Sequence, residues 1–153
     1  MMGERGRVVA AEEEGAPVSP GFVRNQASKD RSARFTLAHA FSCAWSGVVV
    51  SVRTQRNMKI HLAAAAVAVA AGLVLGIDAV SWAVVTLCIA AVVSAECLNT
   101  ALESVVDLVS PEYHELAGRA KDAAAGAVLV LAAASVAVAA FVFVPRLAAL
   151  LAP

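Results

Sequence analysis

Four polar residues are predicted to share one face of a helix in an otherwise apolar stretch: Glu96, Asn99, Glu103 and Asp107. At about 100° per residue these positions fall within about 80° around the helix axis, so they form one polar stripe. An acid at membrane depth costs at least about 2.5 kcal/mol on insertion scales, and such acids usually serve a function. The stripe is therefore the first candidate for a functional site.

Carboxylates with a carboxamide and a nearby lysine are suited to magnesium and phosphate chemistry. Mg²⁺ usually takes one or two protein carboxylates, and substrate phosphates and water complete its octahedron. Phosphoryl transfer then needs mainly positioning, charge neutralisation and a base that orients the attacking hydroxyl. A deeper Glu96 with a shallower metal-binding acid suits an acceptor from the bilayer and a nucleotide from the cytosol. The sequence has no Walker A motif or kinase glycine-rich loop, which excludes the common soluble solutions.

The stripe alone leaves a second function open. Acids within a membrane also mark ion paths, so a small proton- or cation-handling membrane protein would use the same residues. The polar segment EYHELAGRAKD at 112–122 favours the first interpretation, because a pore would not need it.

The composition indicates a membrane protein. Of the 153 residues, 60% are hydrophobic and 16% are charged, and the mean hydropathy is +0.76. Soluble domains average about 45–50% apolar and about 25% charged residues. The formal net charge is zero, so charge gives no argument for a nucleic-acid partner. The three cysteines form no CxxC pair and indicate no disulfide framework.

The fold predicted around the stripe is an all-α membrane protein with an amino-terminal amphipathic surface helix and three transmembrane helices. Residues 1–33 carry charges, Gly, Pro and Ser, and are predicted to be a disordered cytoplasmic tail ahead of a membrane domain at 34–153. Apolar residues at three- and four-residue steps predict the surface helix over 34–56, with Trp45 dipped into the interface.

Three apolar runs are each long enough to span a bilayer, at about 60–77, 80–109 and 123–144. Pro111 is predicted to end the second run, and Pro145 the third, since proline cannot continue the helical hydrogen bonding. Three short membrane-spanning helices can shield several acidic side chains from lipid only in part, so a homo-oligomer is expected.

Lysine and arginine set the predicted orientation. They gather before the first span and again at Arg119 and Lys121, whereas the turn at 76–81 has none. The positive-inside rule then places the amino terminus inside and the carboxy terminus outside a cytoplasmic (inner) membrane. Glu103 and Asp107 would lie at the cytoplasmic face, with Glu96 about 10 Å deeper.

Two motifs resemble those of the small prokaryotic diacylglycerol kinases and undecaprenol kinases. The first is Glu96-x-x-Asn-Thr-Ala-Leu-Glu103-x-x-x-Asp107, and the second is Pro111-Glu-Tyr-His-Glu-Leu-Ala-Gly-Arg-Ala-Lys-Asp122 followed by Gly126-Ala-Val-Leu. The resemblance covers about residues 35–145. It implies ATP-dependent phosphorylation of a membrane lipid alcohol with Mg²⁺, from diacylglycerol to phosphatidic acid or from undecaprenol to undecaprenyl phosphate. It also implies a homotrimer with active sites shared between subunits.

The resemblance implies a role for each polar residue by position. Glu96 matches the general base for the lipid hydroxyl, Asn99 a polar residue near the transferred phosphate, and Glu103 a metal ligand. The implied ATP contacts are Glu112, Tyr113, His114, Lys121 and Asp122. The candidate substrate contacts are Trp45 and Asp107; the alternatives are an interface anchor for Trp45 and a solvated helix end for Asp107.

One position departs from the family pattern. The run Gln55-Arg-Asn-Met-Lys-Ile-His61 resembles the family segment Glu-Arg-Asn-Phe-Arg-Ile-His, whose Glu is a metal ligand. An amide oxygen can still bind Mg²⁺, but a full charge is lost. A raised Mg²⁺ requirement is therefore expected, and a catalytically impaired family member is the alternative. His39 and His61 are predicted to be structural. On resemblance alone, the run from Gln55 to His61 is closer to the undecaprenol kinases of the family.

Overall fold

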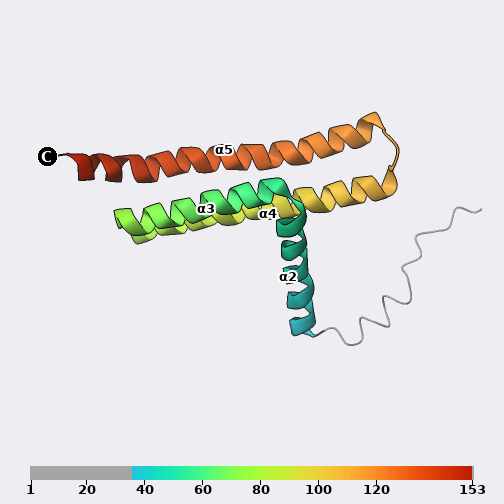
Figure 1. Cartoon of the computed structure of the whole chain (residues 1–153), viewed down its shortest axis with the longest axis horizontal. Helices are drawn as coiled ribbons and strands as arrows, with labels where there is room; N and C mark the ends of the chain where they lie inside the picture. Colours follow the sequence, from blue (N-terminus) through green and yellow to red (C-terminus); the bar gives the residue numbers. More distant parts are fainter. Residues whose placement is uncertain (1–35, 153) are drawn as a thin grey trace, which may run out of the picture. The chain divides into compact units, whose positions relative to one another are not determined.

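The computed structural model describes residues 36–152, which are helical apart from short connections and contain no strand (Figure 1). The helices are α2 (Leu37–Thr54), α3 (Arg56–Leu75), α4 (Ala79–Val109) and α5 (Glu115–Leu151). The all-α prediction is confirmed for this part of the chain. The predicted tail at 1–33 lies outside the described residues.

Three of the helices, α3, α4 and α5, are long and apolar enough to cross a membrane. They contain 20, 31 and 37 residues. At 1.5 Å per residue α4 and α5 measure about 46 and about 55 Å, against roughly 30 Å of hydrocarbon in a bilayer. Each is therefore long enough to carry polar residues at one end beyond the hydrocarbon.

The first two spans follow the prediction with small shifts at their ends. The α3 helix ends at Gly76, whose backbone is left-handed (φ 59°, ψ 48°), a conformation that glycine adopts without steric cost. The α4 helix begins after Asp78, and Ser110 and Pro111 follow its end, as expected.

The α5 helix is longer than the predicted span at 123–144. It begins at Glu115, so Lys121 and Asp122 lie on the helix and only 110–114 connect it to α4. His114 caps the start, because its Nδ1 accepts from the backbone N–H of Leu116 at 3.2 Å. At the other end the helix runs through Pro145 to Leu151, so the prediction that Pro145 ends it is wrong.

A contact between residues far apart in sequence lies next to Pro145. The next residue, Arg146, donates from Nη2 to Asp78 Oδ2 at 2.9 Å. Asp78 also caps α4, accepting from the backbone N–H and the hydroxyl of Ser81, both at 3.0 Å. The ion pair thereby joins the end of α5 to the start of α4.

The contacts of Asp78 with Ser81 and Arg146, called the Asp78 clamp below, predict that the stability of the fold depends on pH. The Ser81 backbone N–H and hydroxyl, with Arg146, lower the pKa of Asp78 from 3.8 to about 2. A carboxyl whose pKa is lower in the folded state stabilises the fold above its unfolded value, and that stability is lost as pH falls from about 4 to about 2. We expect Asp78→Asn to lower the thermal unfolding midpoint in detergent at pH 7, and to lower it much less near pH 2, where the Asp78 carboxyl is about half protonated.

The matched variant for this test is Arg146→Gln, which removes the ion pair and keeps the Ser81 cap. Its midpoint should fall less than that of Asp78→Asn. Equal midpoints for Asp78→Asn and the unaltered protein at pH 7 would contradict the clamp.

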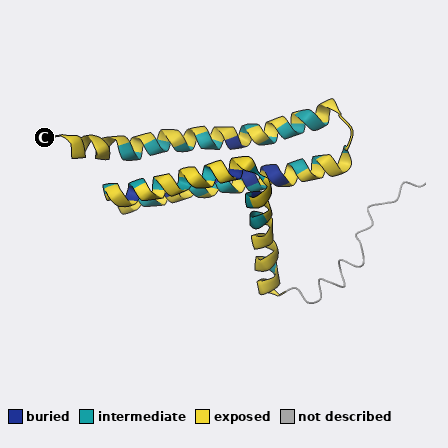
Figure 2. Ribbon diagram, viewed as in Figure 1, coloured by how far each residue is buried: buried dark blue, intermediate teal, exposed yellow. Residues whose placement is uncertain are grey.

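The helices α3, α4 and α5 pack against one another, and α4 and α5, which run in opposite directions, share the largest contact (Figure 1). Figure 2 shows buried positions only on limited parts of each helix. The buried residues of α4 are Val85, Val92, Glu96, Asn99 and Thr100. Their spacing places them on one face, so the deeper part of the polar stripe points into the packed helices.

Candidate active site

Glu96 is a buried acid on an apolar stretch of α4. Its side chain is 1% exposed, and Oε1 has no hydrogen-bond partner. The nearest basic group is Nε2 of His61 on α3, at 3.6 Å from Oε1, which is just too long for a hydrogen bond. A buried carboxylate oxygen without a partner is costly, so it is expected to be kept for a function.

Glu103, two turns further along α4, is held by two carboxamides. Gln55 Nε2 donates to its Oε2 at 2.8 Å, and Asn99 Nδ2 donates to its Oε1 at 3.2 Å. Gln55 is the N-cap residue of α3, so this contact joins positions 48 residues apart. Asn99 keeps a buried Oδ1 without a partner. The structure therefore brings together three residues that the sequence placed in one site.

The oxygens of this cluster suit a magnesium ion that brings its other ligands with it. Glu103 offers one carboxylate, which accepts from the Gln55 and Asn99 amide nitrogens, and rotation of the Gln55 amide would turn its oxygen towards an ion bound there. Within residues 36–152 no group of three or more His, Cys, Asp or Glu side chains is placed to hold a metal. Since Mg²⁺ commonly takes one or two protein carboxylates with phosphate oxygens and water, the set fits an ion that arrives with a nucleotide.

A pocket of about 230 Å³ opens beside the two unpartnered side chains, Glu96 and Asn99. Asn57 and His61 of α3 form a second polar wall. The remaining lining residues are apolar: Ile60, Ala125, Val128, Leu129 and Ala132. A hydroxyl group in this pocket could donate its hydrogen to either of two oxygens, Glu96 Oε1 and Asn99 Oδ1, that have no hydrogen-bond partner within residues 36–152.

An apolar crevice of about 180 Å³ shares His61 and Ala132 with this pocket. It continues between α3, α4 and α5 towards the turn at 76–78. Its wall is made largely of apolar side chains, among them Ala64, Val85, Ile89 and Phe143. The polar pocket thus borders a space suited to a hydrocarbon chain.

Lys121 and Asp107 meet at the end of α4 and the start of α5. Lys121 Nζ forms an ion pair with Asp107 Oδ1. The two side chains are 37% and 66% exposed, and ion pairs at such exposure contribute little to stability. A phosphate group can therefore compete for Lys121 at low cost. Asp122 is exposed on the same helix.

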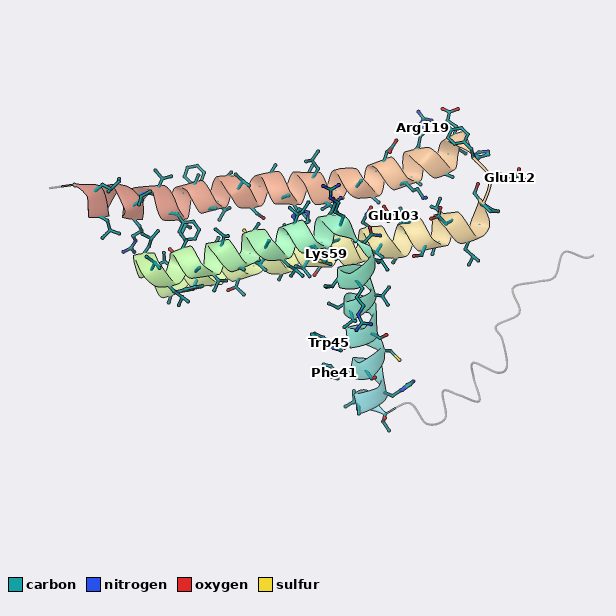
Figure 3. The ribbon with its side chains drawn as sticks, viewed as in Figure 1. Phe41, Trp45, Lys59, Glu103, Glu112 and Arg119 are labelled. Carbon is teal, nitrogen blue, oxygen red and sulfur yellow. The ribbon has the colours of Figure 1, made fainter. Side chains whose placement is uncertain are left out.

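The remaining predicted ATP contacts are not brought to this cluster within the described chain. Glu112, Tyr113 and His114 lie in the connection between α4 and α5, and Tyr113 is 92% exposed. Figure 3 shows Glu112 in that connection, beyond the end of the helix that carries Glu103. Over residues 36–152, no hydrogen bond or ion pair joins these three to the residues around Glu103.

Trp45 lies on α2, where it is exposed and projects from the same side as Phe41 (Figure 3). This arrangement agrees with an apolar stripe on α2. The position of α2 at a membrane surface stays a prediction, as does a substrate contact for Trp45.

His61 is the residue that the sequence interpretation underestimated. It was expected to be structural, yet it faces Glu96 and lines both the polar pocket and the apolar crevice. Asn57 and His61 are four residues apart and therefore share one face of α3. The sequence did contain a signal for a functional role of His61: two polar side chains four residues apart at the start of an apolar span.

The sequence model of the family described as "Prokaryotic diacylglycerol kinase" matches residues 42–143. The chain belongs to this family. The match contains every candidate residue from Trp45 to Asp122, so the site described above lies wholly within the family region.

The relatives that the chain resembles are named for two different substrates, diacylglycerol and undecaprenol. The chain is 46% identical over 116 residues to a diacylglycerol kinase of Synechocystis sp., covering 75% of this chain and 66% of the relative, just under two thirds. It is 40% identical over 108 residues to an undecaprenol kinase of Bacillus subtilis, covering 71% and 88%. It is 33% identical over 94 residues to the diacylglycerol kinase of Escherichia coli K12, covering 61% and 77%.

Proposed function

We propose that this protein is a membrane lipid kinase that transfers the γ-phosphate of ATP to the hydroxyl group of a lipid alcohol. The observation that carries the proposal is Glu96, a buried carboxylate with an unpartnered oxygen, on the wall of a pocket beside the Glu103 cluster. Membership of a kinase family favours this function over ion handling. The relatives are named for diacylglycerol and undecaprenol, both of which are lipid alcohols.

In the proposed reaction, Glu96 acts as the general base. The lipid O–H bond breaks, its proton passes to the Glu96 carboxylate, and the oxygen forms a bond to the γ-phosphorus. The bond from that phosphorus to the bridging oxygen breaks, and ADP leaves with the electron pair. Asn99 lines the same pocket and lies near the transferred phosphate in this proposal.

The metal side of the site consists of Glu103 and Gln55. These residues would hold a Mg²⁺ ion, which neutralises charge on the phosphates when it is bound. Lys121 exchanges Asp107 for a phosphate oxygen, and Asp122 with Glu112, Tyr113 and His114 completes the nucleotide contacts. Each of these assignments follows the position of the residue in the family motif.

We further propose that the working unit is a homotrimer with shared sites. Two features of a single chain support this. Residues 111–114 of its connection are exposed and, within residues 36–152, form no hydrogen bond or ion pair with the Glu103 cluster; large apolar side chains are exposed along α3, α4 and α5. A neighbouring subunit supplies a partner for both in the proposed assembly.

The proposed location is the cytoplasmic membrane, with the amino terminus inside and the carboxy terminus outside. Arg53 lies in the last turn of α2, Arg56 and Lys59 lie at the start of α3, and Arg119 and Lys121 lie near the start of α5. The connection at 76–78 has no basic residue, as expected for an outer loop.

The apolar crevice beside Glu96 suits the chain of either acceptor, so the experiment compares the two side by side. The full-length protein, purified in detergent, is given ATP, Mg²⁺ and either 1,2-diacylglycerol or undecaprenol, with a lipid-free reaction as the control. We expect a phosphorylated lipid with at least one acceptor. No lipid product with either acceptor over the whole range of Mg²⁺ concentrations would overturn the proposal.

A further inference from the structure

His61 and Glu96 face each other between α3 and α4. His61 Nε2 lies 3.6 Å from Glu96 Oε1, and the Glu96 side chain is 1% exposed whereas that of His61 is 21% exposed. Both side chains line the polar pocket of about 230 Å³. His61, which is partly exposed, thus lies beside the buried Glu96 side chain and on the wall of the pocket.

Glu96 has few other sources of a hydrogen bond. The α5 wall of the pocket is apolar, with Val128 and Leu129 opposite. On α4 itself, the Asn99 amide donates to Glu103, and the Thr100 hydroxyl donates to the Glu96 backbone carbonyl at 2.8 Å. Asn57 lines the same pocket but makes no hydrogen bond to Glu96, so within residues 36–152 His61 Nε2, at 3.6 Å, is the donor that the structure places beside the Glu96 carboxylate.

We infer that His61 is the positioning residue for Glu96 in the lipid kinase reaction, an inference that rests on the proposed function. In its neutral form with the proton on Nε2, the ring donates to Glu96 Oε1. This bond fixes the orientation of the carboxylate and turns its other oxygen towards the acceptor hydroxyl. His61 carries no proton through the reaction; the proton released by the lipid hydroxyl stays on Glu96 until the product leaves.

The 3.6 Å separation agrees with this role. Hydrogen bonds in catalytic sites are often this long in the resting enzyme and shorten as the reacting groups come together. A shift of a few tenths of an ångström brings Nε2 and Oε1 into hydrogen-bond range. A charge-assisted bond of this kind affects the rate by about tenfold.

The kinetic test uses two substitutions at one position. His61→Leu removes the donor and keeps an apolar side chain of similar bulk, whereas His61→Gln restores an N–H donor near the position of Nε2. We expect kcat to fall about tenfold in His61→Leu with the KM for ATP unchanged, and His61→Gln to recover most of the loss. His39→Leu, the same change at an exposed histidine on α2, is the matched control and should leave kcat unchanged.

A spectroscopic test measures the pair without activity. In protein labelled with ¹⁵N-histidine, Glu96→Gln should change the chemical shift of the His61 Nε2 resonance and leave that of His39 in place. An unchanged His61 resonance overturns the inference, as does normal kcat in His61→Leu, or a His61→Gln variant as slow as His61→Leu. If the unaltered protein phosphorylates neither lipid, the proposed function fails, and the resonance still decides whether the two side chains are paired.

Discussion

Glu96→Gln is expected to lower kcat for lipid phosphorylation by at least about a hundredfold while the protein remains folded and assembled. A positioned general base contributes typically about 10²- to 10⁴-fold, and the amide cannot accept the proton. The substitution keeps the size of the side chain, so the pocket keeps its shape. The measurement is kcat with ATP and the lipid both saturating, alongside circular dichroism and size-exclusion chromatography.

The same variant separates catalysis from structure. Because Glu96 Oε1 is buried without a hydrogen-bond partner, replacing the acid by a neutral amide should leave the thermal midpoint equal or higher. Glu115→Gln, an exposed acid in the first turn of α5, is the control and should change neither property. Near-normal kcat in Glu96→Gln would remove the general base from the mechanism, and a large drop in midpoint would make Glu96 a structural residue.

Gln55→Glu is expected to lower the Mg²⁺ concentration at half-maximal activity by between about tenfold and a hundredfold. In the present chain, Gln55 Nε2 donates to Glu103 Oε2 at 2.8 Å, so the Glu103 carboxylate has a hydrogen-bond donor when no cation is bound. A glutamate at position 55 would place two carboxylates together. Two like charges about 4 Å apart near a protein surface repel by about 4 kcal/mol, and a divalent cation relieves that repulsion.

Stability provides a second readout for this prediction. Without Mg²⁺, the repulsion should lower the thermal midpoint of Gln55→Glu below that of the unaltered protein, and Mg²⁺ should raise it more steeply, because ligand binding stabilises in proportion to affinity. Gln55→Leu, which lacks both the donor and the charge, should show no such steep rise. A half-saturation in Gln55→Glu that is unchanged or higher would reject a metal role for position 55.

The sequence predicted most of the helical framework because the signals are local. Long apolar runs, the turn at Gly76 and the end of the second span at Pro111 each depend on neighbouring residues. The extent of α5 did not follow, since the helix continues through Pro145 and Arg146 beyond it pairs with Asp78, 68 residues away. Helical periodicity does not predict a contact between two residues so far apart in the sequence.

The same division holds for the candidate site. Glu96, Asn99 and Glu103 share a helix face, and their spacing alone placed them together. The contacts of Gln55 with Glu103 and of His61 with Glu96 depend on how α3 packs against α4, which a single sequence does not encode locally. For Gln55 the family motif supplied the missing information, whereas nothing comparable pointed to His61.

The central claim is tested most directly by following the γ-phosphate itself. The full-length protein in lipid bilayers is given Mg²⁺, ATP labelled at the γ-phosphorus, and the better of the two lipid alcohols, and the label is then sought in the lipid extract and in the water phase. The account predicts label in a lipid phosphate with the unaltered protein and almost none with Glu96→Gln. Label found only in ATP or inorganic phosphate with the unaltered protein would contradict it.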